Sequence, residues 1–186
     1  IFLAQYKFNA PSIGGGDKEE AWKQAEEIAK LSTAEGHKLK GQFYSQEKNY
    51  EKAVIEYDEI LKLEPENTHI YYLKGIAYQQ AEKYNEALNS FESALKIDPE
   101  ALESLYQIGR NAVFSKTGLD RGIEALNEYL KHKPDKTLPQ TDAAYWRLAM
   151  IYQIKNDIEK AKEMINKAIA VNPDNDEYKK LLKELN

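Results

Sequence analysis

The chain has 186 residues, of which 31 are Asp or Glu and 26 are Lys or Arg, so its formal net charge at pH 7 is -5. This acidic balance argues against a surface that neutralises nucleic-acid phosphates. The absence of cysteine excludes disulfides, thiol catalysis and thiolate metal sites. No apolar run approaches the ~18 residues that a membrane-spanning helix needs.

The first segment, residues 1–33, is predicted to form two helices joined by a long loop. The first helix is expected around Ile1 to Phe8, and the loop Asn9 to Gly16 contains three consecutive glycines. Glycines before a helix can bind phosphate, but no Lys-Ser/Thr pair follows them and no strand precedes them, so we interpret the loop as a turn. Asp17 and Glu20 form a capping box that starts the second helix. One face of that helix carries Ala21, Ala25, Ile28 and Leu31.

Residues 68–101 carry the clearest pattern in the chain. Two helix-period runs flank a polar break at 79–83, which predicts a helical hairpin. The first run consists of Tyr71, Lys74, Gly75 and Tyr78, and the second of Ala87, Phe91, Ala94 and Pro99. The small residues fall where the two helices must touch, and the aromatic side chain fills the space toward the next hairpin.

The same pattern recurs when the unit is shifted along the chain. It returns in residues 34–67, in 102–136 with one extra residue in the turn from Ser115 to Asp120, and in 142–175. Thr137 to Thr141 is then an insertion between the last two copies. Four pairs that end in proline are expected to end the second helices, because a residue before proline is pushed out of the helical region. They begin at Glu64, Asp98, Lys133 and Asn172.

This arrangement of Gly, Tyr, Ala, an aromatic residue and Pro over 34 residues resembles the tetratricopeptide repeat family. The resemblance implies an all-α fold, a right-handed superhelix of stacked helical hairpins. Residues 1–33 would form a divergent N-terminal hairpin, 34–175 four repeats, and 176–186 a capping helix with a polar outer side. The loop before Asp17 resembles loops of exported bacterial members, so we expect a periplasmic or otherwise exported protein, with a cytoplasmic one as the alternative. The start at Ile1 suggests a processed product, and the terminal helix suggests a native C-terminus.

The resemblance also implies that the first helix of each hairpin lines a concave groove. Groove positions follow an i, i+4, i+8 row on each of these helices. The rows become more aromatic toward the C-terminus, and aromatic residues with arginine are typical of binding hot spots. We therefore predict a partner-binding site formed by Tyr72, Ile76, Tyr106, Arg110, Phe114, Trp146 and Met150. The alternative is that superhelical curvature buries these side chains between first helices, or that the register is wrong.

Tetratricopeptide proteins that clamp a peptide carboxylate do so with Lys and Asn residues. Only Lys38 matches that set here, so such a clamp is not expected. The differing positions are Gln42, Leu73, Glu103 and Gln107.

The sequence favours binding over catalysis. His37, His69 and His132 have no ligand-spaced partners, and no serine has a base nearby. We expect no cofactor, no metal site and no catalytic residue. The leading hypothesis is a scaffold that binds a peptide or helix of a partner protein. The alternatives are a self-assembling homo-oligomer and a regulatory part of a larger enzyme.

Overall fold

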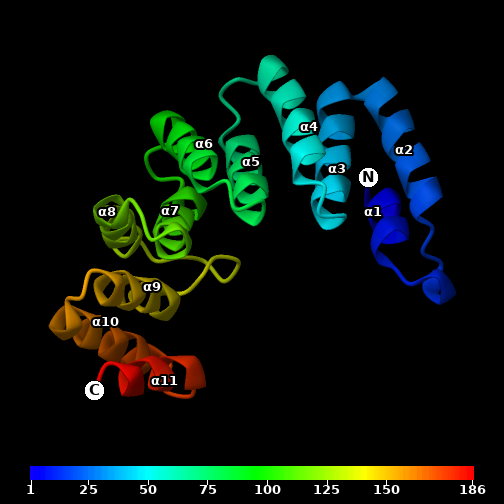
Figure 1. Ribbon diagram of the computed structural model, residues 1–186. Helices are drawn as coiled ribbons and strands as arrows, with labels where there is room; N and C mark the ends of the chain where they lie inside the picture. Colours follow the sequence, from blue (N-terminus) through cyan, green and yellow to red (C-terminus); the bar gives the residue numbers. More distant parts are fainter. The chain divides into compact units, whose positions relative to one another are not determined.

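The computed structural model describes residues 1–186 and consists of helices and their connections, without β-strands (Figure 1). This confirms the expected all-α fold class. The chain divides into two compact units, Ile1–Ser90 and Phe91–Asn186. Helix α6, Tyr84–Ile97, contains the boundary between them. None of the helices combines the length and the apolar character that crossing a bilayer requires.

The first unit contains five complete α-helices and one 3-10 turn. They are α1 Phe2–Asn9, η1 Ser12–Gly14, α2 Lys18–Leu31, α3 Thr33–Gln46, α4 Tyr50–Leu63 and α5 Thr68–Gln80. Asp17 caps α2 as predicted, because its side chain accepts the backbone N–H of Glu20 at 3.0 Å. Ser32 precedes α3, but its side chain makes no capping hydrogen bond. Ser32 alone connects α2 to α3, and its backbone is extended.

Aromatic residues form the core that joins α1, α2 and α3. The rings of Phe8 and Phe43 stack with centroids 4.0 Å apart, and the Trp22 ring meets Phe43 edge-on at 5.3 Å. Ala21 and Ala25 are buried on the predicted face of α2. Leu31 was expected on that face but is 89% exposed, because it is the last residue of α2 and lies beyond the contact with α3.

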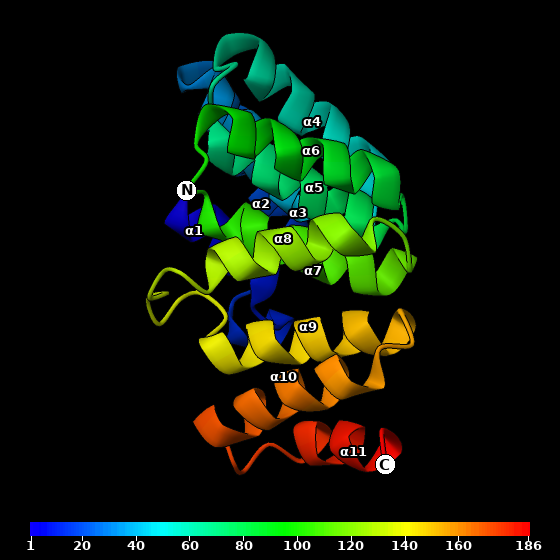
Figure 2. The same ribbon diagram turned by 90° about the vertical axis from the view of Figure 1, so that its left-hand side faces the viewer.

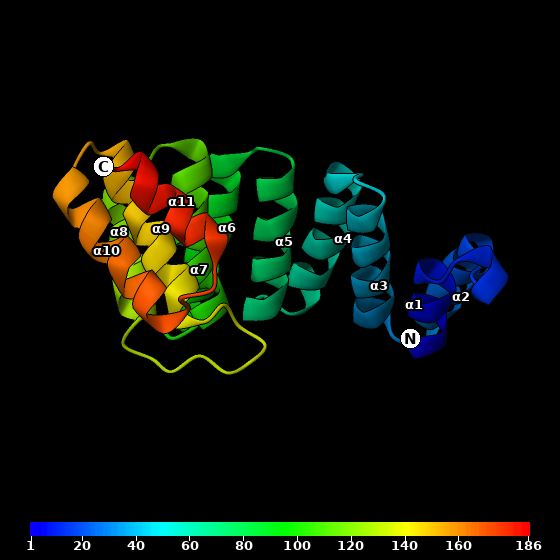
Figure 3. The ribbon, with the colours of Figure 1, turned by 90° about the horizontal axis from the view of Figure 1, so that it is seen from below.

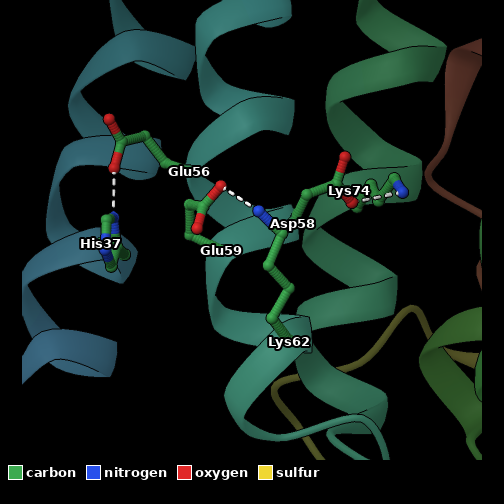
Figure 4. A network of polar contacts seen from close by, with 6 residues as sticks. All are labelled: His37, Glu56, Asp58, Glu59, Lys62 and Lys74. Carbon is green, nitrogen blue, oxygen red and sulfur yellow. Dashed lines mark hydrogen bonds and ion pairs between the residues drawn. The ribbon is translucent and has the colours of Figure 1, made fainter.

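Polar contacts also connect successive helices of this unit (Figure 4). His37 Nδ1 on α3 lies 2.6 Å from Glu56 Oε2 on α4, and Lys74 Nζ on α5 lies 2.6 Å from Asp58 Oδ1 on α4. Both pairs are partly buried, so they are less screened by solvent than surface pairs. His37 therefore has a structural partner within the fold.

The second unit contains five complete helices and the end of α6 (Figure 2). They are α7 Leu102–Ser115, α8 Leu119–Tyr129, α9 Thr141–Ile154, α10 Ile158–Val171 and α11 Asp176–Glu184. Helix α7 packs against α8 and α9, α9 packs against α10, and α10 packs against α11. The buried residues Tyr178, Leu181 and Leu185 attach the C-terminal end to this core.

Three of the hairpins end their first helix with the same turn. Lys48, Glu82 and Asn156 adopt the left-handed conformation with φ of 60°, 58° and 59°. In each case the next N–H reaches back five residues to a tyrosine carbonyl, as in a Schellman motif. These bonds run from Asn49 to Tyr44, from Lys83 to Tyr78 and from Asp157 to Tyr152, at 2.8, 2.9 and 2.9 Å.

The third hairpin departs from this turn. Lys116 has φ 56°, as expected from the repeat, but Gly118 is also left-handed with φ 60°. The backbone N–H of Thr117 bonds to the Ser115 hydroxyl at 3.2 Å instead of reaching back to the helix. The single extra residue predicted between Ser115 and Asp120 explains this difference.

Helix α8 ends earlier than predicted. It stops at Tyr129, ahead of the Lys133–Pro134 pair, because Lys131 and His132 bond to carbonyls three residues back rather than four. A long connection, residues 130–140, follows and projects from the helices (Figure 3). It is held by the Tyr129 hydroxyl, which donates to the Pro139 carbonyl, and by Gln140 Nε2, which donates to the Asp135 carbonyl at 2.7 Å.

Candidate functional site

The candidate site lies on α7 and α9, the first helices of two neighbouring hairpins. Five side chains form it, and we call them the arginine–aromatic cluster: Arg110, Phe114, Trp146, Arg147 and Met150. Arg110 and Phe114 come from consecutive turns of α7, and the other three come from α9. Because α7 and α9 pack together, the two sets meet on one surface of the second unit.

The cluster is organised by cation–π contacts. Arg110 Cζ lies 4.9 Å from the centre of the Phe114 ring. Arg147 Cζ lies 4.4 Å from the centre of the Trp146 ring and 5.7 Å from that of Phe114. Phe114 is 40% exposed, so the cluster is open to solvent at this ring. These contacts hold two guanidinium groups beside one accessible aromatic side chain.

Arg147 is the unusual member of the cluster. Its Nη1 contacts the Met150 sulfur at 3.5 Å, and its buried Nε has no hydrogen-bond partner. Arg121, in contrast, donates from Nε to Glu92 Oε1 at 2.6 Å and from Nη2 to Glu92 Oε2 at 3.3 Å. Arg147 therefore presents its positive charge without an acidic side chain in ion-pair contact.

A hollow of about 140 Å³ adjoins the cluster between α9 and α11. Trp146, Met150 and Leu181 provide its apolar surface. Its polar lining consists of Gln153, Glu177, Lys180 and Glu184. The hollow can accept an apolar side chain of moderate size against Trp146 and Met150, two residues that Arg147 also contacts.

Helix α11 is held beside Trp146 by a buried polar network. Asp142 Oδ2 accepts hydrogen bonds from the Tyr178 hydroxyl and from Asn172 Nδ2, each at 3.0 Å. Burial, followed by the hydrogen bond to Asp142, raises the pKa of Tyr178 well above its usual value. The Tyr178 ring lies 5.6 Å from that of Trp146, so this network also positions one wall of the hollow.

The structure changes the role of one predicted site residue. Tyr106 was expected to be exposed in a groove, but it is only 7% exposed and its ring lies 5.6 Å from that of Tyr129. Tyr129 is itself buried, and this burial raises its pKa to about 12. Tyr106 is therefore a packing residue between α7 and α8, the two helices of one hairpin, and this contact differs from the burial between first helices that the alternative named.

The remaining predicted residues fall into two groups. Arg110, Phe114, Trp146 and Met150 lie together in the second unit. Tyr72 and Ile76 are partly buried residues of α5 in the first unit, where the Tyr72 ring lies 6.0 Å from that of His69. Their role in binding stays a prediction.

Sequence reasoning missed Arg147. The predicted row on α9 advances by four residues from Trp146, so it omits the residue immediately after Trp146. On the helix, Arg147 is rotated toward α7 and reaches Phe114. Arg147 lies three residues before Met150, and residues with this spacing are neighbours on one face of a helix. This spacing could have placed Arg147 among the predicted site residues.

The described side chains offer no metal centre, since no three His, Asp or Glu residues are grouped to hold an ion. Guanidinium groups beside aromatic side chains suit the recognition of charge and apolar surface.

Comparison with known families identifies the class of protein. Models of the tetratricopeptide repeat match residues 37–67, 70–101 and 142–175, which together are just over half of the chain. The chain belongs to the tetratricopeptide repeat family. Repeats of this kind form protein-interaction scaffolds with extended binding surfaces. No curated protein sequence matches the chain significantly.

Solved structures show the same fold at low sequence identity. A tetratricopeptide repeat protein from Parabacteroides merdae is 17% identical, with a TM-score of 0.79 over 100% of this chain and 70% of that one. YrrB, described as having an unusual peptide-binding site, is 22% identical, with a TM-score of 0.74 over 89% of this chain and 83% of that one. MamA from Desulfovibrio magneticus RS-1 is 22% identical, with a TM-score of 0.74 over 83% of this chain and 84% of that one.

Proposed function

We propose that this protein is a non-catalytic scaffold that binds an acidic, apolar segment of a partner protein at the arginine–aromatic cluster. A carboxylate of the segment would pair with Arg147, with Arg110 near enough to add a second positive charge. A neighbouring apolar side chain would occupy the hollow beside Trp146 and Met150. The likeness in fold to YrrB, a protein with a peptide-binding site, supports a peptide as the ligand.

The proposal rests on one observation, that Arg147 has no acidic side chain in ion-pair contact. A partly buried guanidinium without an acidic partner is electrostatically unfavourable unless another group compensates it. Here the faces of Trp146 and Phe114 supply only part of that compensation. A ligand carboxylate would supply the rest and would gain the charge-assisted hydrogen bonds that an arginine fork favours.

The apolar wall of the hollow, formed by Trp146, Met150 and Leu181, supplies the second half of the recognition. Arginine paired with tryptophan is a typical composition of binding hot spots, particularly where one part of the site excludes water. A ligand side chain in the hollow would cover Trp146 and Met150 and would shield the pair formed by Arg147 from solvent. Charge and apolar contact would therefore strengthen each other at the same place.

Selection from a phage-displayed library of random 12-residue peptides tests this proposal. We expect wild-type protein to enrich peptides that carry Asp or Glu near a large apolar residue. The enriched peptide should bind Arg147→Gln about tenfold to 100-fold more weakly, because hydrogen bonds to charged groups contribute about 1.5–3 kcal/mol. Isothermal titration calorimetry measures both affinities.

The matched control is Arg121→Gln, which removes the same charge from an arginine that already pairs with Glu92. Its affinity for the peptide should remain within about twofold of wild type. The proposal is wrong if selection enriches no acidic peptide, or if the two arginine variants lose the same affinity while circular dichroism shows both folded.

A second proposed function, self-association, is supported by the surface of α1. Phe2, Leu3 and Tyr6 are 83%, 55% and 48% exposed, and the face around Phe2 and Tyr6 carries no acidic residue. Large exposed apolar patches commonly mark interfaces. A second copy of the chain is a suitable occupant because an uncharged patch can meet itself without like-charge repulsion.

Light scattering at micromolar concentration tests this second function. We expect a dimer for wild type and a monomer for the Phe2→Ser, Tyr6→Ser double variant, because a small interface depends on a few large apolar side chains and the variant removes two of them. Ile13→Ser is the control, because Ile13 is fully exposed but lies outside α1. A monomeric wild type, or a double variant that still dimerises, would contradict self-association through α1.

A further inference from the structure

A second hollow, of about 580 Å³, lies away from the arginine–aromatic cluster. It is formed within the second unit by the end of α6, the connection 98–101, α7 and α8. Its lining residues are Glu92, Leu95, Lys96, Pro99, Glu100, Leu105, Arg121, Glu124 and Glu128. We call it the α6–α8 hollow.

The floor of the α6–α8 hollow is apolar. Leu95 and Leu105 are almost completely buried there, and Pro99 lies beside them at the edge. The aliphatic part of a long side chain can lie over this floor and gains free energy mainly by covering Pro99, which is exposed. The size and floor of the hollow therefore fit a segment that presents extended side chains.

The rim of the hollow is acidic. Four glutamates and two basic residues line it, and Arg121 is already engaged by Glu92 through two hydrogen bonds. The next contact of Arg121, from Nη1 to Glu124 Oε2, is long at 3.9 Å, and Glu124 is largely exposed. Glu100 and Glu124 can therefore accept a further cation more readily than Glu92 can.

We propose that the α6–α8 hollow docks a lysine- or arginine-bearing segment of a partner protein. The aliphatic stem of one basic side chain would lie on Leu95 and Pro99. Its charged end would meet Glu100 and Glu124 at the rim. An acidic segment would meet like charges there, so this surface selects the opposite ligand charge from the arginine–aromatic cluster.

The two surfaces together would let one chain hold two partners of opposite charge, or two segments of one partner. The second docking surface does not depend on the first, because the two share helix α7 but no residue. Variants of Arg147 should consequently leave binding at the α6–α8 hollow unchanged.

A fluorescein-labelled nine-residue peptide of alternating lysine and leucine is a direct probe. We expect fluorescence anisotropy to show binding to wild type, weakening as salt increases. The Glu100→Gln, Glu124→Gln double variant should bind about tenfold more weakly, since each lost rim contact reduces the attraction. A peptide with glutamate in place of lysine should not bind at the hollow.

The Glu159→Gln, Glu163→Gln double variant is the matched control, because it removes two exposed carboxylates from α10. It has the same net charge as the hollow variant and should bind like wild type. Equal weakening in the two double variants would show general attraction to an acidic protein and overturn the proposal. Absence of binding to wild type at low salt would overturn it as well.

Amide NMR distinguishes the two surfaces. The lysine–leucine peptide should shift the resonances of Leu95, Glu100 and Glu124, and Arg147→Gln should leave these shifts intact. Shifts that centre on Arg110 and Trp146 instead would assign the probe to the arginine–aromatic cluster and contradict docking at the α6–α8 hollow.

Discussion

Replacing Gly109 with alanine is expected to lower the free energy of unfolding by about 1–3 kcal/mol, as overpacking of a core does. A Cβ at this position would lie 2.3 Å from Cγ of Leu126 on α8. Leu126 is completely buried, so its side chain has little room to move. Helix α8 also approaches with a glycine, Gly122, whose own Cβ would lie 2.6 Å from Ala112. Urea unfolding followed by circular dichroism measures the loss.

The sign of this effect is informative because helix propensity works in the opposite direction. Alanine is about 1 kcal/mol more favourable than glycine inside an unconstrained helix, so Gly109→Ala would stabilise a loosely packed hairpin. Gly14→Ala is the control, since the nearest atom to its added Cβ is Pro11 Cδ at 3.8 Å. A stabilised Gly109→Ala protein would show that α7 and α8 do not pack at this distance.

The second large effect is expected for Asp142→Ala, which should lose about 2–3 kcal/mol of stability, because it leaves buried donors without a partner. Asp142 accepts hydrogen bonds from both Tyr178 and Asn172. Without them, α11 is held only by its apolar contacts. Hydrogen exchange should consequently show a larger loss of protection in α11 than in α7 or α8.

Asp142→Asn is the matched variant, because both hydrogen bonds go to one oxygen of Asp142, and an amide oxygen in that place can accept both without the negative charge. It should lose less stability than Asp142→Ala. A double-mutant cycle with Tyr178→Phe isolates the contact between the two side chains, and we expect a coupling energy of about 1 kcal/mol or more. Additive losses in the cycle would mean that the Asp142–Tyr178 hydrogen bond adds no stability.

The parts of the fold that could be predicted from the sequence are those marked by residues that recur in every repeat. Glycine at 41 and 109 and alanine at 53 and 161 mark helix contacts, and the structure places all four in buried positions. The proline pairs at Asp98 and Asn172 directly follow α6 and α10. These features depend on local sterics that every repeat shares, so a single pattern predicts them all.

The predictions that were wrong or incomplete concern features set by contacts between helices and loops, which the repeat pattern does not specify. Helix α8 ends early because residues 130–140 form their own turn and are bonded to Tyr129. Tyr106 is buried because Tyr129 lies against it, and the position of Tyr129 could not be inferred from the row on α7 alone. Arg147 belongs to the site because α9 is rotated so that this residue reaches Phe114 on α7. Such features require the actual rotation of neighbouring helices.

The central claim is that the arginine–aromatic cluster binds an acidic, apolar peptide. Titrating labelled protein with the most enriched library peptide, and following backbone amide and indole resonances by NMR, tests it most directly. We predict that the largest shifts fall on Arg110, Phe114, Arg147 and the indole of Trp146, and that Arg147→Gln removes them at the same peptide concentration. Shifts confined to α8 and α10, or shifts that persist in Arg147→Gln, would contradict the claim.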